Sequence, residues 1–163
     1  MMEFMLWLEQ TSLGTFVRES PSYLGFPGFL FAHTLGLSLV VGPAVVIGIR
    51  ILGMAPAIPL KPLVRLFPFM WVGFAITVMS GVGLAVADAS NKLLNPILLT
   101  KLVLILFATI NLWFLKKRVF DRADVGEVVD KQGRILAGSL MSLWLLVTIA
   151  GRLIAYWRAI FDV

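Results

Sequence analysis

Residues 24–49 of this chain read LGFPGFLFAHTLGLSLVVGPAVVIGI, and His33 is their only ionisable side chain. An apolar run of roughly 20 residues is long enough for a helix to cross the hydrocarbon core of a bilayer. The stretch therefore predicts a membrane-spanning helix. Three further stretches of the same kind cover about residues 66–87, 96–115 and 135–157, with Lys101 inside the third and Arg152 inside the fourth.

Composition supports the same interpretation for the whole chain of 163 residues. Hydrophobic residues make up 60% and charged residues 14%, and the mean hydropathy is +0.95. A soluble domain is nearer half apolar and a quarter charged. We therefore expect an all-α integral membrane four-helix bundle that forms a single domain over residues 1–163. This class excludes a soluble enzyme, a disordered tail and a nucleic-acid binder, although the net charge is +5.

Residues 1–20 differ from the spans because Glu3, Glu9, Arg18 and Glu19 interrupt them. Their apolar residues recur at helical spacing, which is typical of an amphipathic helix. Such a helix lies in the plane of the interface rather than across the bilayer. We expect one amphipathic helix on the membrane surface.

The basic residues predict the orientation. Lys and Arg accumulate in the loops that remain on the cytoplasmic side. Two loops carry nearly all of them: Arg50, Lys61 and Arg65 between spans one and two, and Lys116, Lys117, Arg118, Arg122, Lys131 and Arg134 between spans three and four. Both loops should be cytoplasmic, which predicts a multi-pass protein of the bacterial inner membrane with both termini periplasmic.

This orientation places ionisable residues of several spans at a similar depth in the outer half of the membrane. Lys101 follows Pro96 by five residues and Arg152 precedes Trp157 by five, so each lies about 8 Å inside the outer surface. His33 lies early in span one, and Asp88 closes span two on the same side. Ionisable residues inside a bilayer usually face the bundle and mark functional sites. We expect a polar chamber open toward the outer surface.

Helical stripes of small or polar residues predict which faces point inward. Span one carries Gly36, Val40, Ala44 and Ile47 below His33; span two carries Gly73, Thr77, Ser80, Gly81, Leu84 and Asp88; span four carries Gly138, Ser142, Leu145, Ile149, Arg152 and Tyr156. We expect all three stripes to line the interior.

A b-type haem is the first candidate occupant, because histidine is a common axial ligand in helical proteins. His33 would bind the iron, and Gly36, one turn away, would leave room for the macrocycle. The chain has no cysteine and no second histidine, so the sixth position would be open, come from a second subunit, or fall to Met79. The two propionates would meet Lys101, Arg152 and Tyr156.

Other interpretations of the same residues stay open. The chamber could be a quinone or lipid-headgroup pocket that uses His33, Arg152 and Tyr156 as donors, or the chain could be an accessory subunit without a ligand. His33 could be a neutral imidazole bonded to Ser, Thr or Tyr, and Lys101 and Arg152 could extend to the outer interface. Copper is a weaker option. No base–nucleophile pair indicates an enzyme with covalent chemistry.

Several short stretches together resemble an uncharacterised family of bacterial four-span inner-membrane proteins. They are FAHTLG at 31–36, RILG at 50–53, LFPFMWVGF at 66–74, Asn95-Pro96 followed by Lys101, and GRLIAY at 151–156. The early histidine and the glycines after it are distantly similar to copper-resistance D type and b-type cytochrome membrane proteins. The resemblance names no function. We expect a bilayer protein associated with other membrane subunits or with its own copies. We expect at most a non-catalytic electron-transfer subunit, with haem b or a quinone as its cofactor.

Overall fold

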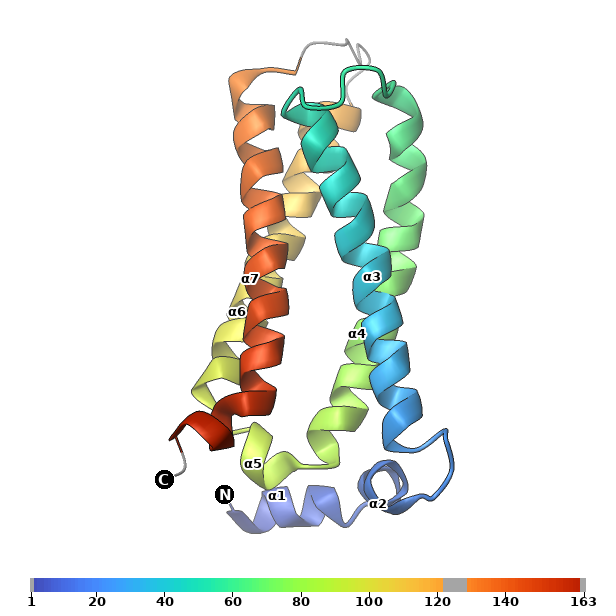
Figure 1. Ribbon diagram of the computed structural model, residues 1–163, viewed down its shortest axis with the longest axis vertical. Helices are drawn as coiled ribbons and strands as arrows, with labels where there is room; N and C mark the ends of the chain where they lie inside the picture. Colours follow the sequence, from blue (N-terminus) through green and yellow to red (C-terminus); the bar gives the residue numbers. More distant parts are fainter. Residues whose placement is uncertain (1, 122–128, 162–163) are drawn as a thin grey trace.

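The computed structural model describes residues 2–121 and 129–161, and four long helices form most of this part of the chain (Figure 1). They are α3 (Phe26–Ile51), α4 (Leu66–Val86), α6 (Pro96–Leu115) and α7 (Lys131–Phe161). A short 3-10 helix, η1 (Lys61–Arg65), leads into α4, and a π-helical turn, η2 (Lys116–Phe120), extends α6. Each of the four is long and apolar enough to cross a membrane. The predicted helical bundle with four candidate spans is therefore present.

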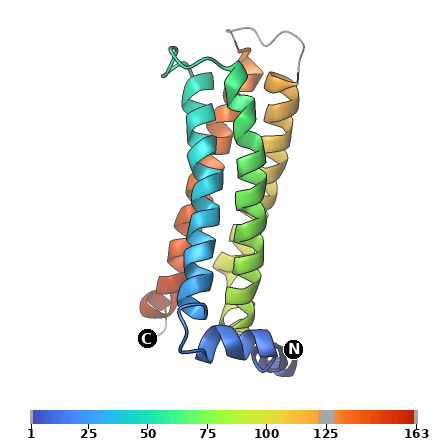
Figure 2. The same cartoon turned by 90° about the vertical axis from the view of Figure 1, so that its right-hand side faces the viewer.

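The bundle has two distinct ends. Helices α1, α2 and α5 lie at one end together with the end of α7, and we call this the terminal end (Figures 1 and 2). The connection from α3 to η1, the end of η2 and the start of α7 lie at the opposite end. We call it the basic end, because the predicted cytoplasmic loops lie there. Which end faces the cytoplasm stays a prediction from the distribution of Lys and Arg.

The N-terminal region forms two helices, α1 (Met2–Glu9) and α2 (Ser12–Glu19), so the prediction of one continuous helix is wrong. Thr11 separates them. Its hydroxyl donates to the Leu8 carbonyl at 2.6 Å and accepts from the Gly14 N–H at 3.3 Å, which caps the start of α2. A threonine hydroxyl competes with the helical backbone in this way. The two helices lie across the terminal end of the bundle (Figure 2).

The long helices pack as two pairs, α3 with α4 and α6 with α7, and α3 also contacts α7. The buried cluster lies mainly in the middle of the bundle and toward the basic end. Its members are Val40, Ala44, Ile47, Ile51, Leu60, Leu63, Phe67, Met70, Ala108, Leu112, Leu115, Val119, Phe120, Ala137, Leu140, Trp144 and Val147. The part of the bundle that holds His33 and Lys101, nearer the terminal end, contributes none of these residues.

Two of the three predicted inward stripes do face the interior. Gly36, Val40, Ala44 and Ile47 of α3 are buried, as are Gly73 and Ser80 of α4. The stripe predicted for α7 points outward instead: Ser142, Leu145, Ile149, Arg152 and Tyr156 are all exposed.

The reversed face of α7 has a physical reason. This helix packs through Ala137, Leu140, Trp144 and Val147, which belong to the buried cluster. Lipid chains are as apolar as a leucine side chain, so packing volume rather than hydrophobicity selects the buried face of a membrane helix. The smaller and more polar stripe was therefore a misleading guide to the interior.

Candidate functional site

The candidate site begins with a close crossing of α3 and α4. A Cβ added to Gly36 would lie 2.5 Å from Thr77 Oγ1 and 2.7 Å from the Gly73 carbonyl oxygen. The two backbones approach this closely because glycine lies on both helices. One turn nearer the terminal end, the His33 ring packs on Gly81, whose added Cβ would lie 3.1 Å from Cε1. The crossing thus holds the imidazole against α4.

Ser80 fixes the orientation of the imidazole. His33 Nδ1 lies 3.2 Å from Ser80 Oγ, and Ser80 Oγ lies 2.6 Å from the Ile76 carbonyl oxygen, with the Thr77 carbonyl oxygen at 3.2 Å. A hydroxyl has one proton to donate. Since the short contact to a carbonyl requires that proton, Ser80 accepts from Nδ1–H. The neutral ring is then protonated at Nδ1, and its Nε2 lone pair is left as an acceptor.

Lys101 approaches the same region from the other helix pair. The Asn95 side chain accepts from the Ile97 N–H at 2.9 Å and caps α6, with Pro96 in the first turn. A Cβ added to Gly151 of α7 would lie 3.4 Å from Lys101 Nζ. The ammonium is close enough to His33 to act on it electrostatically. We call His33, Ser80, Lys101 and the two glycines beside them, Gly81 and Gly151, the histidine–lysine site.

Within residues 2–121 and 129–161, Lys101 forms no hydrogen bond or ion pair. A cation inside the membrane is costly unless a polar group or water compensates it. The site therefore combines an uncompensated donor from α6 with an imidazole acceptor from α3. This combination suits a ligand that carries both an oxygen acceptor and a hydroxyl group.

Arg152 and Tyr156 do not join this site. The Arg152 guanidinium lies 3.4 Å from Tyr156 Oη and 5.6 Å from the centre of its ring. Both side chains are exposed on the outer face of α7, whereas the neighbouring Gly151 faces Lys101. The four-residue spacing that placed them on one stripe was correct, but the stripe faces outward. Asp88 does not join the site either, because its carboxylate forms a local ion pair with Lys92 Nζ at 3.7 Å.

The residues expected to complete a haem site are not arranged around His33. Met79 is 73% exposed and lies on the outer face of α4. The room expected beside Gly36 is filled by α4 itself. In the described part of the chain there is no cluster of three or more histidine, cysteine or acidic residues that could hold a metal ion. Met79 and Gly36 therefore do not provide the second ligand and the free space that were expected of them, and haem binding itself stays a prediction.

Ser80, Gly81 and Gly151 are the members of the site that the sequence did not single out as binding residues. Ser80 and Gly81 did appear on the inward stripe of span two, and a serine bonded to His33 was one of the open interpretations. The pattern could not show that α3 pairs with α4, and this pairing makes Ser80 the partner of His33. The inward stripe expected for span four contained Arg152 instead of its neighbour Gly151, although Gly151 is the residue that faces Lys101.

Comparison of the chain with protein-family models, with curated proteins and with solved structures finds no match. The function is therefore argued from the geometry above.

Proposed function

We propose that this chain is a small, non-catalytic subunit of a membrane assembly that binds a quinone at the histidine–lysine site. The observation that carries the proposal is the convergence of Lys101 and His33 from opposite helix pairs. The Lys101 ammonium lies beside Gly151 of α7, while Ser80 of α4 holds the His33 ring. The assignment also rests on the membrane location expected from four apolar helices.

A quinone suits the two polar groups chemically. In its oxidised form a ring carbonyl accepts a hydrogen bond from the Lys101 ammonium. In its reduced form a ring hydroxyl donates to Nε2 of His33, whose other nitrogen is engaged by Ser80. An apolar tail would remain among the helices and lipid chains. A pocket with a few convergent polar groups among apolar walls is typical of small-molecule sites.

An accessory subunit without a ligand is the second candidate, and local pairing of the polar groups favours it. Arg152 contacts Tyr156 and Asp88 contacts Lys92, so two of the ionisable groups near the terminal end need no ligand. Under this proposal the histidine–serine bond would serve only to fix helix packing. In either case we place the protein in the bacterial inner membrane with the basic end in the cytoplasm.

The deciding experiment measures quinone bound to the purified full-length chain. Protein in mild detergent is extracted for co-purified quinone and titrated with a short-chain quinone, and the variants are His33→Ala and Lys101→Met. Arg152→Gln is the matched control, since it removes one cation at similar depth from the outward face. We expect Lys101→Met to weaken binding of the quinone about tenfold, equivalent to one hydrogen bond to a charged group. His33→Ala should weaken binding of the corresponding quinol, which is titrated in the same way, and the control should bind both forms normally.

Three results would overturn the proposal. Equal quinone binding by all variants would place the quinone elsewhere on the chain, and no quinone binding by a correctly folded wild-type protein would leave the accessory subunit. A visible Soret band that disappears in His33→Ala would show that haem, rather than quinone, occupies the site. Circular dichroism of each variant establishes that the fold is retained before binding is compared.

A further inference from the structure

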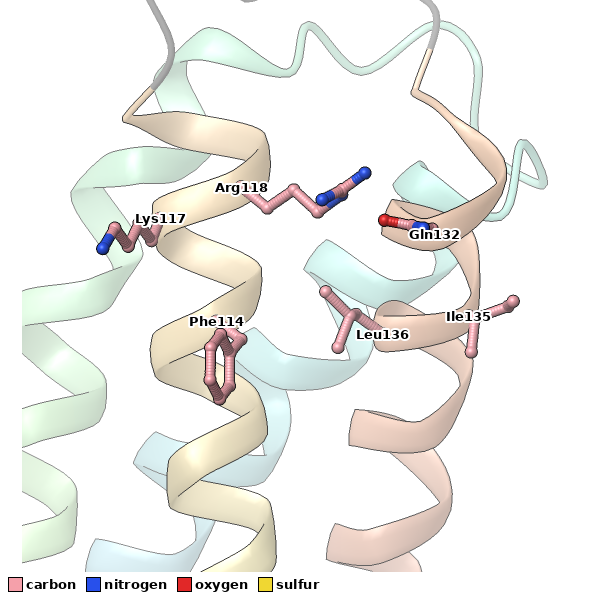
Figure 3. A pocket seen from close by; sticks show the side chains of 6 residues that line it. All are labelled: Phe114, Lys117, Arg118, Gln132, Ile135 and Leu136. Atoms are coloured by element: carbon pink, nitrogen blue, oxygen red, sulfur yellow. The ribbon is translucent and has the colours of Figure 1, made fainter.

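A broad groove lies between α6 and α7 at the basic end, far from the histidine–lysine site. Its volume is about 600 Å³, and it is lined by Phe114, Lys117, Arg118, Gln132, Ile135 and Leu136. Figure 3 shows the side chains of Arg118 and Gln132 reaching toward each other across the gap between the two helices, with Leu136 below them. Lys117 extends from the opposite flank of the same turn (Figure 3).

Polar and apolar residues are layered in this groove in the same order on both helices. Phe114 precedes Arg118 by four residues on α6 and η2, and Leu136 follows Gln132 by four residues on α7. The two helices run in opposite directions, so each apolar residue lies about 6 Å nearer the middle of the bundle than its polar partner. The groove thus has a polar rim at the basic end and an apolar wall below it.

The rim carries positive charge that the described carboxylates do not fully balance. The Arg118 guanidinium pairs with Asp130 at 2.8 Å, but its Nε is buried without a hydrogen-bond partner. Lys117 lies over the Trp113 ring at 5.1 Å and, in residues 2–121 and 129–161, pairs with no carboxylate. Lys131, in the first turn of α7, is exposed and likewise has no carboxylate partner in this part of the chain.

We propose that this groove binds an anionic phospholipid. The phosphate would accept hydrogen bonds from Arg118 and Gln132, and the acyl chains would lie along Phe114, Ile135 and Leu136. The Lys117 ammonium, on the opposite flank of the same turn, would attract the headgroup electrostatically without contacting it. Both halves of the lipid are needed, because a soluble phosphate would leave the apolar wall exposed to water. Basic pockets between membrane helices near the cytoplasmic surface are known to suit acidic lipid headgroups. The groove opens sideways between two helices, where the surrounding lipid reaches it directly.

The test compares lipids and matched charge variants of the full-length chain in detergent. Native mass spectrometry measures the binding of phosphatidylglycerol and of phosphatidylcholine with identical acyl chains. The variant pair is Lys117→Gln with Arg118→Gln, and the control pair is Lys61→Gln with Arg65→Gln. The control removes the same charge from exposed positions of η1 at the same end.

We expect the wild-type chain to prefer phosphatidylglycerol. The groove pair should lose about thirty-fold in affinity for it, which corresponds to two basic groups at a membrane surface, while the control pair keeps its affinity. Lys117→Gln alone leaves the Arg118–Asp130 ion pair in place and should lose about fivefold. The affinity of this single variant can be compared with that of the wild-type chain even if the double variant folds poorly.

Three results would overturn the proposal. The first is equal binding of the two lipids by the wild-type chain. The second is an equal loss in both double variants, because diffuse attraction by the basic end would then explain the preference. The third is displacement of the lipid by glycerol phosphate at similar concentration, which would assign the affinity to the phosphate alone.

Discussion

The Glu9 carboxylate accepts two hydrogen bonds from Ser90, one from the hydroxyl at 2.6 Å and one from the backbone N–H at 2.8 Å. The two residues are 81 positions apart in the chain. The contact joins α1 to α5 (Ala89–Lys92) at the terminal end, and Arg18 of α2 adds an ion pair at 3.7 Å. Glu9 is only 14% exposed. Through these contacts, the Glu9 carboxylate holds the two N-terminal helices against the connection between α4 and α6.

This contact predicts that docking of α1 and α2 depends on pH. The hydrogen bonds from the Ser90 hydroxyl and N–H, with the Arg18 charge, hold the pKa of Glu9 below its ordinary value of 4.5. A carboxyl with a lowered pKa stabilises the folded state above the unfolded pKa, and this contribution disappears as the pH falls through the folded value. We expect the N-terminal helices to stay docked near neutral pH and to loosen progressively below pH 4.5.

Glu9→Gln should lower the free energy needed to undock the same helices at neutral pH by about 1–2 kcal/mol, because hydrogen bonds to a charged group are lost. Hydrogen exchange of residues 2–19, corrected for intrinsic rates, measures both effects. Glu3→Gln is the control, since this exposed residue of α1 carries the same charge. Equal exchange in Glu9→Gln and the control would contradict the assignment.

Gly36→Ala should destabilise the bundle by about 1–3 kcal/mol, the usual cost of overpacking. The new methyl group would meet the Gly73 carbonyl oxygen at 2.7 Å and the Thr77 backbone nitrogen at 2.8 Å, and backbone atoms cannot rotate away. Thermal unfolding in detergent measures the change. Gly42→Ala on the same helix is the control, because its added Cβ meets nothing within 4 Å. A loss of the same size in Gly42→Ala would refute the close crossing.

Ser80→Ala should change the tautomer of His33. In the wild-type chain Ser80 donates to Ile76 and accepts from Nδ1–H, so the Nδ1–H form should dominate. Without the hydroxyl both neutral tautomers become populated. Because the chain has one histidine, selective ¹⁵N labelling gives a single pair of ring signals. Thr34→Ala, next to His33 on α3 but bonded only to the Leu30 carbonyl, should leave these signals unchanged, and a dominant Nε2–H form in the wild type would reject the assignment.

Asn111 and Ser139 should show a direct coupling energy. The Asn111 side-chain amide donates to Ser139 Oγ at 2.6 Å and links α6 to α7. Hydrogen bonds between membrane helices contribute about 0.6 kcal/mol on average. A double-mutant cycle with Asn111→Ala and Ser139→Ala, measured by unfolding in detergent, should give a value of about this size. If the changes in unfolding free energy of the two single variants simply add up in the double variant, the hydrogen bond contributes nothing to stability.

The membrane orientation is tested by reporters fused after Lys117 and after Val163. The distribution of Lys and Arg predicts a cytoplasmic signal for the first fusion and a periplasmic signal for the second. The unfused protein serves as the background control. A cytoplasmic signal from the C-terminal fusion would reverse the assignment and place the histidine–lysine site in the inner half of the membrane.

Local signals identified several features correctly. The apolar length of each span determined the four long helices, and Asn95-Pro96 marked the start of α6, where Asn95 is observed as the cap. The stripe below His33 was also placed correctly, since Gly36 and Val40 are buried. Each of these features depends on residues that are close together in the sequence or on a helix period.

Other features could not be obtained from periodicity. Thr11 divides the N-terminal region because one hydroxyl satisfies two backbone groups, which a hydrophobic pattern does not record. The stripe of α7 was assigned to the wrong face, and Arg152 and Tyr156 were assigned to the site with it. The groove lined by Arg118 and Gln132 was not foreseen, because it requires two distant segments to lie side by side.

The sequence by itself determined that four long helices form, approximately which residues they cover, and which loops carry positive charge. These properties follow from chain length, capping residues and the cost of placing charges in hydrocarbon. Only the tertiary structure decided that His33 meets Ser80 and approaches Lys101, while Arg152 turns away on α7. The physical reason is that lipid chains and a protein core are almost equally apolar. Helix pairing and facing are therefore selected by the fit of side-chain volumes, which becomes visible only when the helices are assembled.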